Sequence, residues 1–285
     1  MVSLKALYKQ TASALCAAGG DASEAEYEAQ LILSRAVGCD YRFAVLRDPD
    51  VCATVQQESE INEITRRRLL GEPLQYIFGE WDFYNLTFEV GKGVLIPRQD
   101  TETLVELAAE NYLADGMVCA DLCAGSGCIG ICLGAQRRAQ IYCYEKSPQA
   151  MEYLKRNIAK NSGSIKGSVT PVLADVLDER TAASQMFDMI VSNPPYLTAE
   201  EMGSLQRELC FEPEMALFGG NDGLDFYRAI LRIWTKRLKS GGLFAVEIGE
   251  TQAEAVSQIF AENRIHPKVV NDCGGNNRVV YGIKN

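Results

Sequence analysis

The sequence predicts an α/β fold, in which a mostly parallel sheet carries helices on both faces and a small helical domain precedes it. From about Met117 onward, strand and helix patterns alternate, which is typical of a parallel sheet. The first 75 residues show helical apolar spacing without strand patterns. Hydrophobic residues make up 47% of the 285 residues, so the chain can bury a sizeable core.

The charge and the cysteine content limit the function classes. The formal net charge is -10, which argues against a broad nucleic-acid surface, since such surfaces are usually basic. No apolar run approaches the roughly 18 residues of a membrane-spanning helix, and no signal-peptide core follows the first residues. We therefore expect a cytoplasmic protein that does not bind membranes. Its ten cysteines are then expected to be thiols, and their spacing does not favour a metal site.

Three helices are expected in residues 1–75. The first carries an apolar face made of Leu4, Leu7, Tyr8 and Leu15. The second begins at a capping box, Ser23-Glu24-Ala25-Glu26, and stops near Gly38. The third runs from about residue 55 to 70 and ends at Gly71. Nothing in this segment predicts catalytic chemistry, so we interpret it as a small helical domain.

Residues 76–98 are expected to form a β-hairpin linker. The strand patterns Trp81–Tyr84 and Leu86–Val90 flank Asn85, which favours a turn. Residues 99–285 then form the main domain, and its first helix is expected to be capped near Asp100.

The main domain shows a series of strands with helices between them. One helix is expected to start near Cys128 and another at Ser147-Pro148, a cap followed by proline in the first turn. A third is expected from about residue 224 to 238, ending at Ser240-Gly241-Gly242. The expected strands are Val118–Leu122, Ile141–Tyr144, Val172–Ala174, Met189–Val191, Leu243–Ile248, a strand near Val269, and Val279–Tyr281.

The tetrapeptide Asn193-Pro194-Pro195-Tyr196 follows the buried-strand pattern Phe187–Ser192. Two prolines in a row cannot extend a strand ladder, and each restricts the residue before it, so a stiff loop is expected. This loop can hold the Asn193 carboxamide oxygen and the Pro194 carbonyl oxygen as two fixed acceptors, with the Tyr196 ring beside them. A planar NH2 group donates two hydrogen bonds and fits such a pair. Taken alone, the motif is equally consistent with an ordinary proline turn.

A glycine-rich loop, Asp121 to Cys128, lies between the first strand of the main domain and its helix. Glycines let backbone amides approach a ligand closely, and a helix amino terminus favours negative groups. The loop matches neither the phosphate loop G-x-x-x-x-G-K-[ST] nor a well-placed G-x-G-x-x-G. Tight packing without a ligand is the alternative explanation.

Carboxylates end the next two strands. Glu145 lies about twenty residues beyond the glycine loop, where an acidic residue commonly accepts hydrogen bonds from ribose hydroxyls. Asp175 ends the third strand and can receive an adenine amino group. Each could instead be a surface or turn carboxylate. Because carboxyl ends of parallel strands share one edge, these residues converge with Asp121 and Asn193 on a single predicted ligand site.

The glycine loop, the strand-end Glu145 and the segment Phe187–Tyr196 together resemble class I S-adenosylmethionine-dependent methyltransferases that modify a planar NH2 nitrogen. Four flanking segments narrow the resemblance: Gly71–Ile77, Leu95–Glu102, Glu212–Asp225 and Asp272–Arg278. With them, the chain resembles the peptide chain release factor glutamine N5-methyltransferase family, known as PrmC or HemK. The resemblance covers nearly the whole chain and is weakest in the first 70 residues.

The resemblance implies a Rossmann-like fold, S-adenosylmethionine as methyl donor and S-adenosylhomocysteine as product. It also implies the acceptor, the glutamine of the Gly-Gly-Gln motif in bacterial class I release factors, and a role for residues 1–75 in engaging them. The implied cofactor-binding residues are Asp121, Cys123, Ala124, Gly125, Ser126, Gly127, Glu145, Asp175, Val176 and Asn193. The implied substrate-binding residues are Asn193, Pro194, Pro195 and Tyr196, of which Asn193, Pro194 and Tyr196 are the catalytic ones.

The chain departs from the usual family pattern at three positions. Cys123 stands where the family usually has glycine, Glu145 replaces the more usual aspartate, and Val176 replaces an aromatic residue of some members. None of these changes removes an essential group. Arg98, Thr101 and Glu102 are expected to support the site, although a role in starting the helix explains them equally well.

Two other functions compete with this reading. An adenine or cytosine amino methyltransferase acting on nucleic acid uses the same tetrapeptide, but the acidic balance and the lack of a large basic insert argue against it. A non-catalytic protein on the same fold is the other alternative, since fold alone does not establish function. The intact segment Asn193–Tyr196 argues against that alternative.

Overall fold

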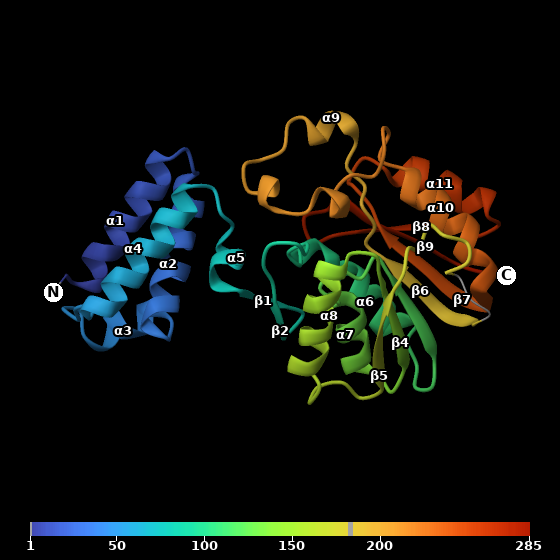
Figure 1. The fold of residues 1–285 in the computed structure, drawn as a ribbon, viewed down its shortest axis with the longest axis horizontal. Helices are drawn as coiled ribbons and strands as arrows, with labels where there is room; N and C mark the ends of the chain where they lie inside the picture. The colour runs from blue at the N-terminus through green and yellow to red at the C-terminus, as the bar shows by residue number, and fades with distance from the viewer. Residues whose placement is uncertain (1, 182–184) are drawn as a thin grey trace. The chain divides into compact units, whose positions relative to one another are not determined.

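The computed structural model describes residues 2–181 and 185–285, which form two compact units, Met1–Gly79 and Glu80–Asn285 (Figure 1). Met1, the first residue of the expected helical domain, lies outside the described residues. Each unit has its own apolar core. We call them the helical unit and the sheet unit. The division falls after Gly79, inside the segment 76–98 that the sequence predicts as a linker.

The described residues of the helical unit form helices and one isolated bridge between Ser3 and Cys52, around a core that includes Leu4, Ile32, Leu33 and Ile61. The apolar face predicted for the first helix is confirmed at Leu4, Leu7 and Leu15, which are buried. The helices are α1 (Leu4–Ala17), α2 (Ala22–Val37), α3 (Tyr41–Arg47), α4 (Val55–Leu69) and α5 (Leu74–Phe78). The sequence did not predict α3 or α5, because elements this short carry little periodic signal.

The capping box predicted at residues 23–26 is wrong. The second helix begins earlier, at Ala22, and its cap is Asp21, whose carboxylate accepts a hydrogen bond from the Ser23 amide at 2.8 Å. The Ser23 hydroxyl itself donates to Asp21 and is therefore engaged elsewhere. A carboxylate at this position also stabilises the positive end of the helix dipole.

The sheet unit contains a two-stranded hairpin and a seven-stranded sheet in the order β5-β4-β3-β6-β7-β9-β8. Strands β3 to β7 are mutually parallel, whereas β9 runs antiparallel to both of its neighbours. This confirms the predicted mostly parallel sheet. The strands of the large sheet are β3 (Val118–Leu122), β4 (Gln140–Glu145), β5 (Ser168–Leu173), β6 (Phe187–Ser192), β7 (Leu238–Glu247), β8 (Lys268–Asn271) and β9 (Asn277–Ile283).

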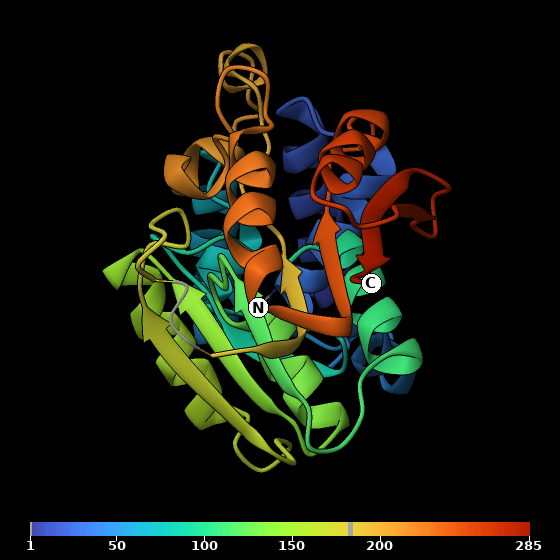
Figure 2. The same cartoon turned by 90° about the vertical axis from the view of Figure 1, so that its right-hand side faces the viewer.

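Helices cover both faces of this sheet (Figures 1 and 2). Helices α6 (Glu102–Asn111), α7 (Cys128–Gln136) and α8 (Pro148–Lys160) pack on one face. Helices α10 (Asp225–Trp234) and α11 (Ala253–Glu262) pack on the other. The side chains of β7 alternate between the two cores, Leu243 and Ala245 toward one and Phe244 and Val246 toward the other. A strand buried on both faces explains the continuous apolar run in the sequence.

Shorter elements complete the unit, and two predictions about them are wrong. Asp100 does not cap a helix, because a 3₁₀ turn, Gln99–Thr101, leads directly into α6. The segment Ser240-Gly241-Gly242 is part of β7 rather than a stop after α10, and β6 and β7 shift register at this end. The remaining short elements are α9 (Ala199–Met202) and the 3₁₀ turns Leu209–Phe211, Glu214–Ala216 and Thr235–Arg237.

The ten cysteines are unpaired and differ in their exposure. Four are buried in the sheet unit, and burial raises the pKa of the Cys119 thiol to about 12. Cys123 is half-buried. The exposed cysteines are Cys16, Cys39, Cys52, Cys210 and Cys273. None of the helices in the described part of the chain combines the length and the apolar character needed to cross a lipid bilayer.

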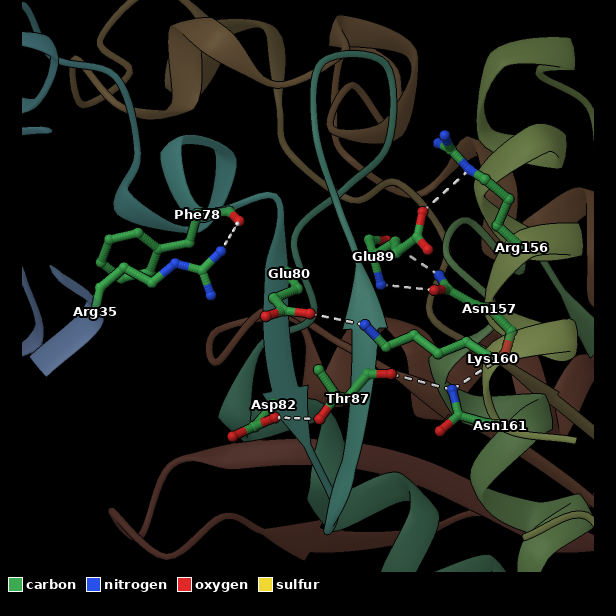
Figure 3. A network of polar contacts seen from close by, with 10 residues as sticks. All are labelled: Arg35, Phe78, Glu80, Asp82, Thr87, Glu89, Arg156, Asn157, Lys160 and Asn161. Atoms are coloured by element: carbon green, nitrogen blue, oxygen red, sulfur yellow. Dashed lines mark hydrogen bonds and ion pairs between the residues drawn. The ribbon is translucent and has the colours of Figure 1, made fainter. Parts of the chain in front are cut away.

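The hairpin of β1 (Glu80–Phe83) and β2 (Leu86–Glu89) is held to α8 by two asparagine side chains (Figure 3). The buried Asn157 accepts from the Glu89 amide at 2.6 Å and donates to the Glu89 carbonyl at 3.1 Å, as a neighbouring strand would. Asn161 donates to the Thr87 carbonyl. Asn157 also donates to the Ser126 carbonyl at 2.9 Å, so one side chain joins the hairpin to the glycine loop.

Replacing Asn157 by alanine should destabilise the sheet unit by about 3 kcal/mol, because buried backbone groups of Glu89 and Ser126 lose their partner. Both tryptophans, Trp81 and Trp234, belong to this unit, so denaturant unfolding followed by tryptophan fluorescence reports on it selectively. The matched control is Lys160→Ala, which removes a partly exposed ion pair with Glu80 and should cost about 0–1 kcal/mol. Equal losses for the two variants would contradict the role given to Asn157.

Candidate active site

The glycine loop and the tetrapeptide Asn193–Tyr196 meet at the point where the order of the strands in the sheet reverses. Strands β3 and β6 are neighbours although β4 and β5 intervene in the sequence. Leu122, the last residue of β3, lies level with Ser192, the last residue of β6, and the Ser192 hydroxyl donates to the Leu122 carbonyl at 2.7 Å. The glycine loop and Asn193 therefore start side by side, at the kind of switch point where open α/β sheets bind ligands.

The glycine loop is tightly wound. Gly125 and Gly127 have left-handed backbones with φ of 55° and 83°. A Cβ on Gly127 would come within 2.3 Å of the Leu154 side chain, so the loop tolerates only glycine there. Cys123 adopts φ 61°, a region that favours glycine.

Asp121 lies beneath the loop rather than on the wall of the pocket. It is fully buried, and one carboxylate oxygen accepts from the Gly130 amide at 2.9 Å, while the other has no protein partner among the described residues. Burial raises the pKa of Asp121 to about 7. Its visible task is to hold the first turn of α7 against the end of β3.

Glu145 ends β4 as the sequence predicts, whereas β5 stops at Leu173, two residues before Asp175. Glu145 is buried, and its two oxygens accept from the Gly125 amide at 2.8 Å and the Ser147 amide at 2.6 Å. A carboxylate has about four lone-pair sites, so further donors can still bind. Asp175 forms an ion pair with Lys146 at 2.8 Å. The neighbouring Val176 is buried and accepts from the Trp234 indole through its carbonyl.

These residues surround a pocket of about 880 Å³, counted with its open mouth. Of the predicted site residues, those on the pocket wall are Cys123, Ala124, Gly125, Ser126, Glu145, Asp175, Val176, Asn193 and Pro195. The polar groups of the wall include the carboxylates of Glu145 and Asp175, the Asn193 side chain and the hydroxyls of Ser126 and Ser147, a set that fits the amino acid, ribose and base parts of S-adenosylmethionine.

The tetrapeptide is anchored on both sides. The Asn193 amide nitrogen donates to the Thr101 hydroxyl at 3.2 Å. Tyr196 is half-buried against the core, and its carbonyl accepts from the Gln252 amide at 3.0 Å. Gly219 and Gly223 pack so closely on the Tyr196 backbone that a Cβ on either would come within 3 Å of it. The motif Glu212–Asp225 thus includes glycines that seat the tetrapeptide.

The supporting role expected for Arg98 and Thr101 has a structural counterpart. Arg98 pairs with Glu212, a buried carboxylate that also accepts from the Ile96 amide at 2.9 Å. This ion pair joins two segments of the pocket wall that are far apart in the sequence. Glu102 has a different role: its carboxylate accepts a hydrogen bond from the Tyr84 amide at the hairpin turn. The sequence reading did not identify Glu212 or Gln252 as site-supporting residues.

Glu247 was also missed. It ends β7, is buried, and one of its oxygens has no partner among the described residues. Burial raises its pKa to about 7, against the lowering effects of the Thr101 hydroxyl and the Arg278 charge. The available signal was a carboxylate after the apolar run Leu243–Val246, the same pattern that identifies Glu145.

The raised pKa of Glu247 predicts a pH-dependent stability. Because the folded-state pKa lies above the unfolded value, the ionised carboxylate lowers stability above about pH 7, and this cost disappears as the pH falls toward the unfolded value. Glu247→Gln should therefore raise the melting temperature by roughly 2–6 °C at pH 8 and lose that advantage at pH 5. Differential scanning fluorimetry at the two pH values measures this, with exposed Glu254→Gln as control. A constant difference at both pH values would contradict the assignment.

Comparison with known proteins agrees with this geometry. The methyltransferase small domain matches residues 99–217, and the PrmC N-terminal domain matches residues 6–79. Among solved structures, a methyltransferase from Pyrococcus furiosus superposes with a TM-score of 0.54 at 17% identity, covering 71% of this chain and 91% of its own. A 16S rRNA methyltransferase of T. thermophilus, in complex with AdoMet and guanosine, gives a TM-score of 0.51 at 18% identity, covering 72% of this chain and 50% of its own. At these identities the structures show the fold, a class I methyltransferase fold.

Sequence relatives are much closer. The release factor glutamine methyltransferase of Thermodesulfovibrio yellowstonii is 39% identical over 259 residues, 89% of this chain and 90% of its own. The protein of the same name from Clostridium botulinum is 35% identical over 267 residues, covering 91% and 92%. With such identity over nearly the full length of both chains, the chain belongs to the release factor glutamine methyltransferase family.

Proposed function

We propose that this enzyme transfers a methyl group from S-adenosylmethionine to the N5 nitrogen of the glutamine in the Gly-Gly-Gln motif of bacterial class I release factors. The observation that carries the proposal is the position of Asn193. Asn193 lies on the wall of the pocket, beside the glycine loop, at the switch point of the sheet. The names of the relatives supply the substrate class.

Four parts of the pocket are proposed to hold the cofactor. The loop from Cys123 to Gly127 would cradle the methionine part, supported by Asp121 beneath. Glu145 would accept from the ribose hydroxyls, and Asp175 and Val176 would border the adenine. When bound, S-adenosylmethionine supplies an electrophilic methyl group on a sulfonium centre. The side chain of Asn193 completes the cofactor side of the pocket.

The tetrapeptide is proposed to bind the glutamine and make its nitrogen reactive. An amide nitrogen is a poor nucleophile because its lone pair is delocalised into the carbonyl group. The Asn193 side-chain oxygen and the Pro194 carbonyl would each accept one N–H of the glutamine, which favours a pyramidal nitrogen with an available lone pair. Pro195 keeps the loop stiff, and Tyr196 beside them would pack against the amide.

Catalysis then depends on position and fixed dipoles more than on proton transfer. The nitrogen becomes cationic as its bond to the methyl carbon forms and the bond from carbon to sulfur breaks. The proton can leave afterwards, so no strong general base is required. A carboxamide and a backbone carbonyl, both neutral acceptors, suit this sequence of events because they stabilise the developing charge on nitrogen.

The remaining assignments follow from this activity. Residues 1–75 are proposed to engage the release factor, residues 76–98 to link, and residues 99–285 to carry out the chemistry. Release factors act in the cytoplasm, and the five exposed unpaired cysteines suit a reducing compartment. We therefore propose a cytoplasmic enzyme whose partners are release factors, with neither membrane nor nucleic acid as substrate.

Incubation of the protein with S-adenosylmethionine and an unmethylated release factor should add one methyl group to the Gly-Gly-Gln glutamine, detected by peptide mass spectrometry. Asn193→Ala should lower the turnover rate about 10²-fold or more, as other losses of a transition-state hydrogen bond do. Asn263→Ala, a change at the end of α11, is the matched control and should retain activity. Near-normal turnover by Asn193→Ala would refute the catalytic assignment.

A release factor in which the acceptor glutamine is replaced by alanine should remain unmodified. If the wild-type protein instead methylates DNA or RNA and leaves the release factor unchanged, the nucleic-acid alternative replaces the proposal.

Glu145→Gln should weaken binding of S-adenosylhomocysteine roughly ten-fold, because a charge-assisted acceptor is lost from the loop and the ribose. Isothermal titration calorimetry measures the dissociation constant directly. Glu152→Gln, which changes an exposed carboxylate on α8, is the control and should bind as the wild type does. Unchanged affinity in Glu145→Gln would remove Glu145 from the cofactor site.

A further inference from the structure

The orientation of the Asn193 carboxamide raises a question that the proposed chemistry depends on. The oxygen and the NH2 group of an asparagine are nearly the same size, so the side chain fits its site in two orientations related by a half-turn. Only one of them presents an acceptor to the substrate nitrogen. The other presents a donor to a group that is itself a donor. Something in the protein has to select between them.

Thr101 contacts the relevant atom. It ends the 3₁₀ turn before α6, is 2% exposed and lies on the pocket wall. Its hydroxyl oxygen lies 3.2 Å from the Asn193 amide nitrogen, although 92 positions separate the two residues. A hydroxyl can either donate or accept, however. Thr101 alone would therefore tolerate both orientations of the carboxamide.

Glu247 removes this ambiguity. Strands β6 and β7 are parallel, and Ser192 lies level with Val246, so Asn193 and Glu247 leave their strands side by side. Glu247 is 1% exposed and lies next to the Thr101 hydroxyl. An ionised carboxylate only accepts hydrogen bonds. While Glu247 is ionised, the hydroxyl hydrogen of Thr101 is therefore drawn to it, and a lone pair of the hydroxyl is left for the Asn193 amide nitrogen.

The surroundings hold the carboxylate in place. Arg278, which is largely buried, faces this region and pairs with Asp272 at 3.0 Å and with Asp100 at 3.2 Å. Its positive charge favours the ionised form of Glu247 and opposes the burial that raises the pKa of this carboxyl to about 7. Asp100 precedes Thr101 by one residue, so the same arginine ties the turn that carries Thr101 to the loop before β9.

We infer that Thr101 and Glu247 are positioning residues that set the direction of the hydrogen bonds around Asn193, so that its oxygen faces the substrate amide. In this arrangement the Asn193 amide donates to the Thr101 hydroxyl, and the Thr101 hydroxyl donates to the Glu247 carboxylate. The inference rests on the proposed function for its substrate. It adds two residues that touch neither the reacting nitrogen nor the methyl group.

The decisive comparison is between Thr101→Val and Thr101→Ser. Valine keeps the shape and loses the hydroxyl, so the carboxamide is no longer held in one orientation. We expect the turnover rate on the release factor to fall about ten-fold, with KM for the release factor within about two-fold and unchanged affinity for S-adenosylhomocysteine. Serine should restore most of the rate. A normal rate in Thr101→Val, or failure of serine to rescue, would overturn the inference.

A double-mutant cycle separates positioning from a general structural role. If Thr101 acts through Asn193, Thr101→Val should cause no further loss in the Asn193→Ala background, within about two-fold. A second ten-fold loss there would show that Thr101 acts independently and would overturn the inference. Glu247→Gln should lower the turnover rate about three-fold, because the glutamine amide can also donate to Thr101. A normal turnover rate would exclude Glu247 from the positioning role.

A measurement without substrate keeps the inference distinct from the proposed function. The side-chain NH2 signals of Asn193 can be identified in ¹⁵N-asparagine-labelled protein by their absence from Asn193→Ala. Their hydrogen exchange should be about ten-fold faster in Thr101→Val than in the wild type, because the bond that protects them is gone. Unchanged exchange would overturn the inference. A wild-type protein that methylates no release factor would instead refute the proposed function, whatever the exchange rates.

Discussion

The pairing of β3 with β6 is the constraint on which the rest of the site depends. These two strands lie at the point where the chain stops winding in one direction and starts winding in the other. Leu122 and Ser192 are level and are joined by a side-chain hydrogen bond. The glycine loop and the tetrapeptide are proposed to hold one ligand, and they can meet it together only because this register brings their first residues to the same height.

Much of the site could be predicted because its signals are local. The glycine loop, Glu145 and the tetrapeptide each directly follow an apolar run, and parallel strands bring their carboxyl ends together. Glu212 could not be found in this way, since its partner Arg98 lies 114 positions away. Glu247 was hidden because the strand was expected to continue to Ile248. The fold followed from alternation, whereas short elements such as α3 depend on packing that no local pattern reports.

Buried polar side chains do much of the joining in this fold. Asn157 links the hairpin to the glycine loop, Glu212 links two walls of the pocket, and Glu247 lies behind Thr101. Each is desolvated, and each is stabilised only where its partners are correctly placed. Such residues therefore favour one arrangement of distant segments over similar ones, a task that apolar contacts perform less selectively.

The distribution of thiols has a consequence for how the protein ages in solution. The exposed cysteines are not among the residues that line the pocket, whereas the buried thiols of the sheet unit have raised pKa values and carry little thiolate. Air oxidation should therefore begin at the surface and link copies of the chain into disulfide-bonded multimers before it reaches the core. Disulfides are reversible, so material that has lost solubility on storage should be recoverable with a reducing agent.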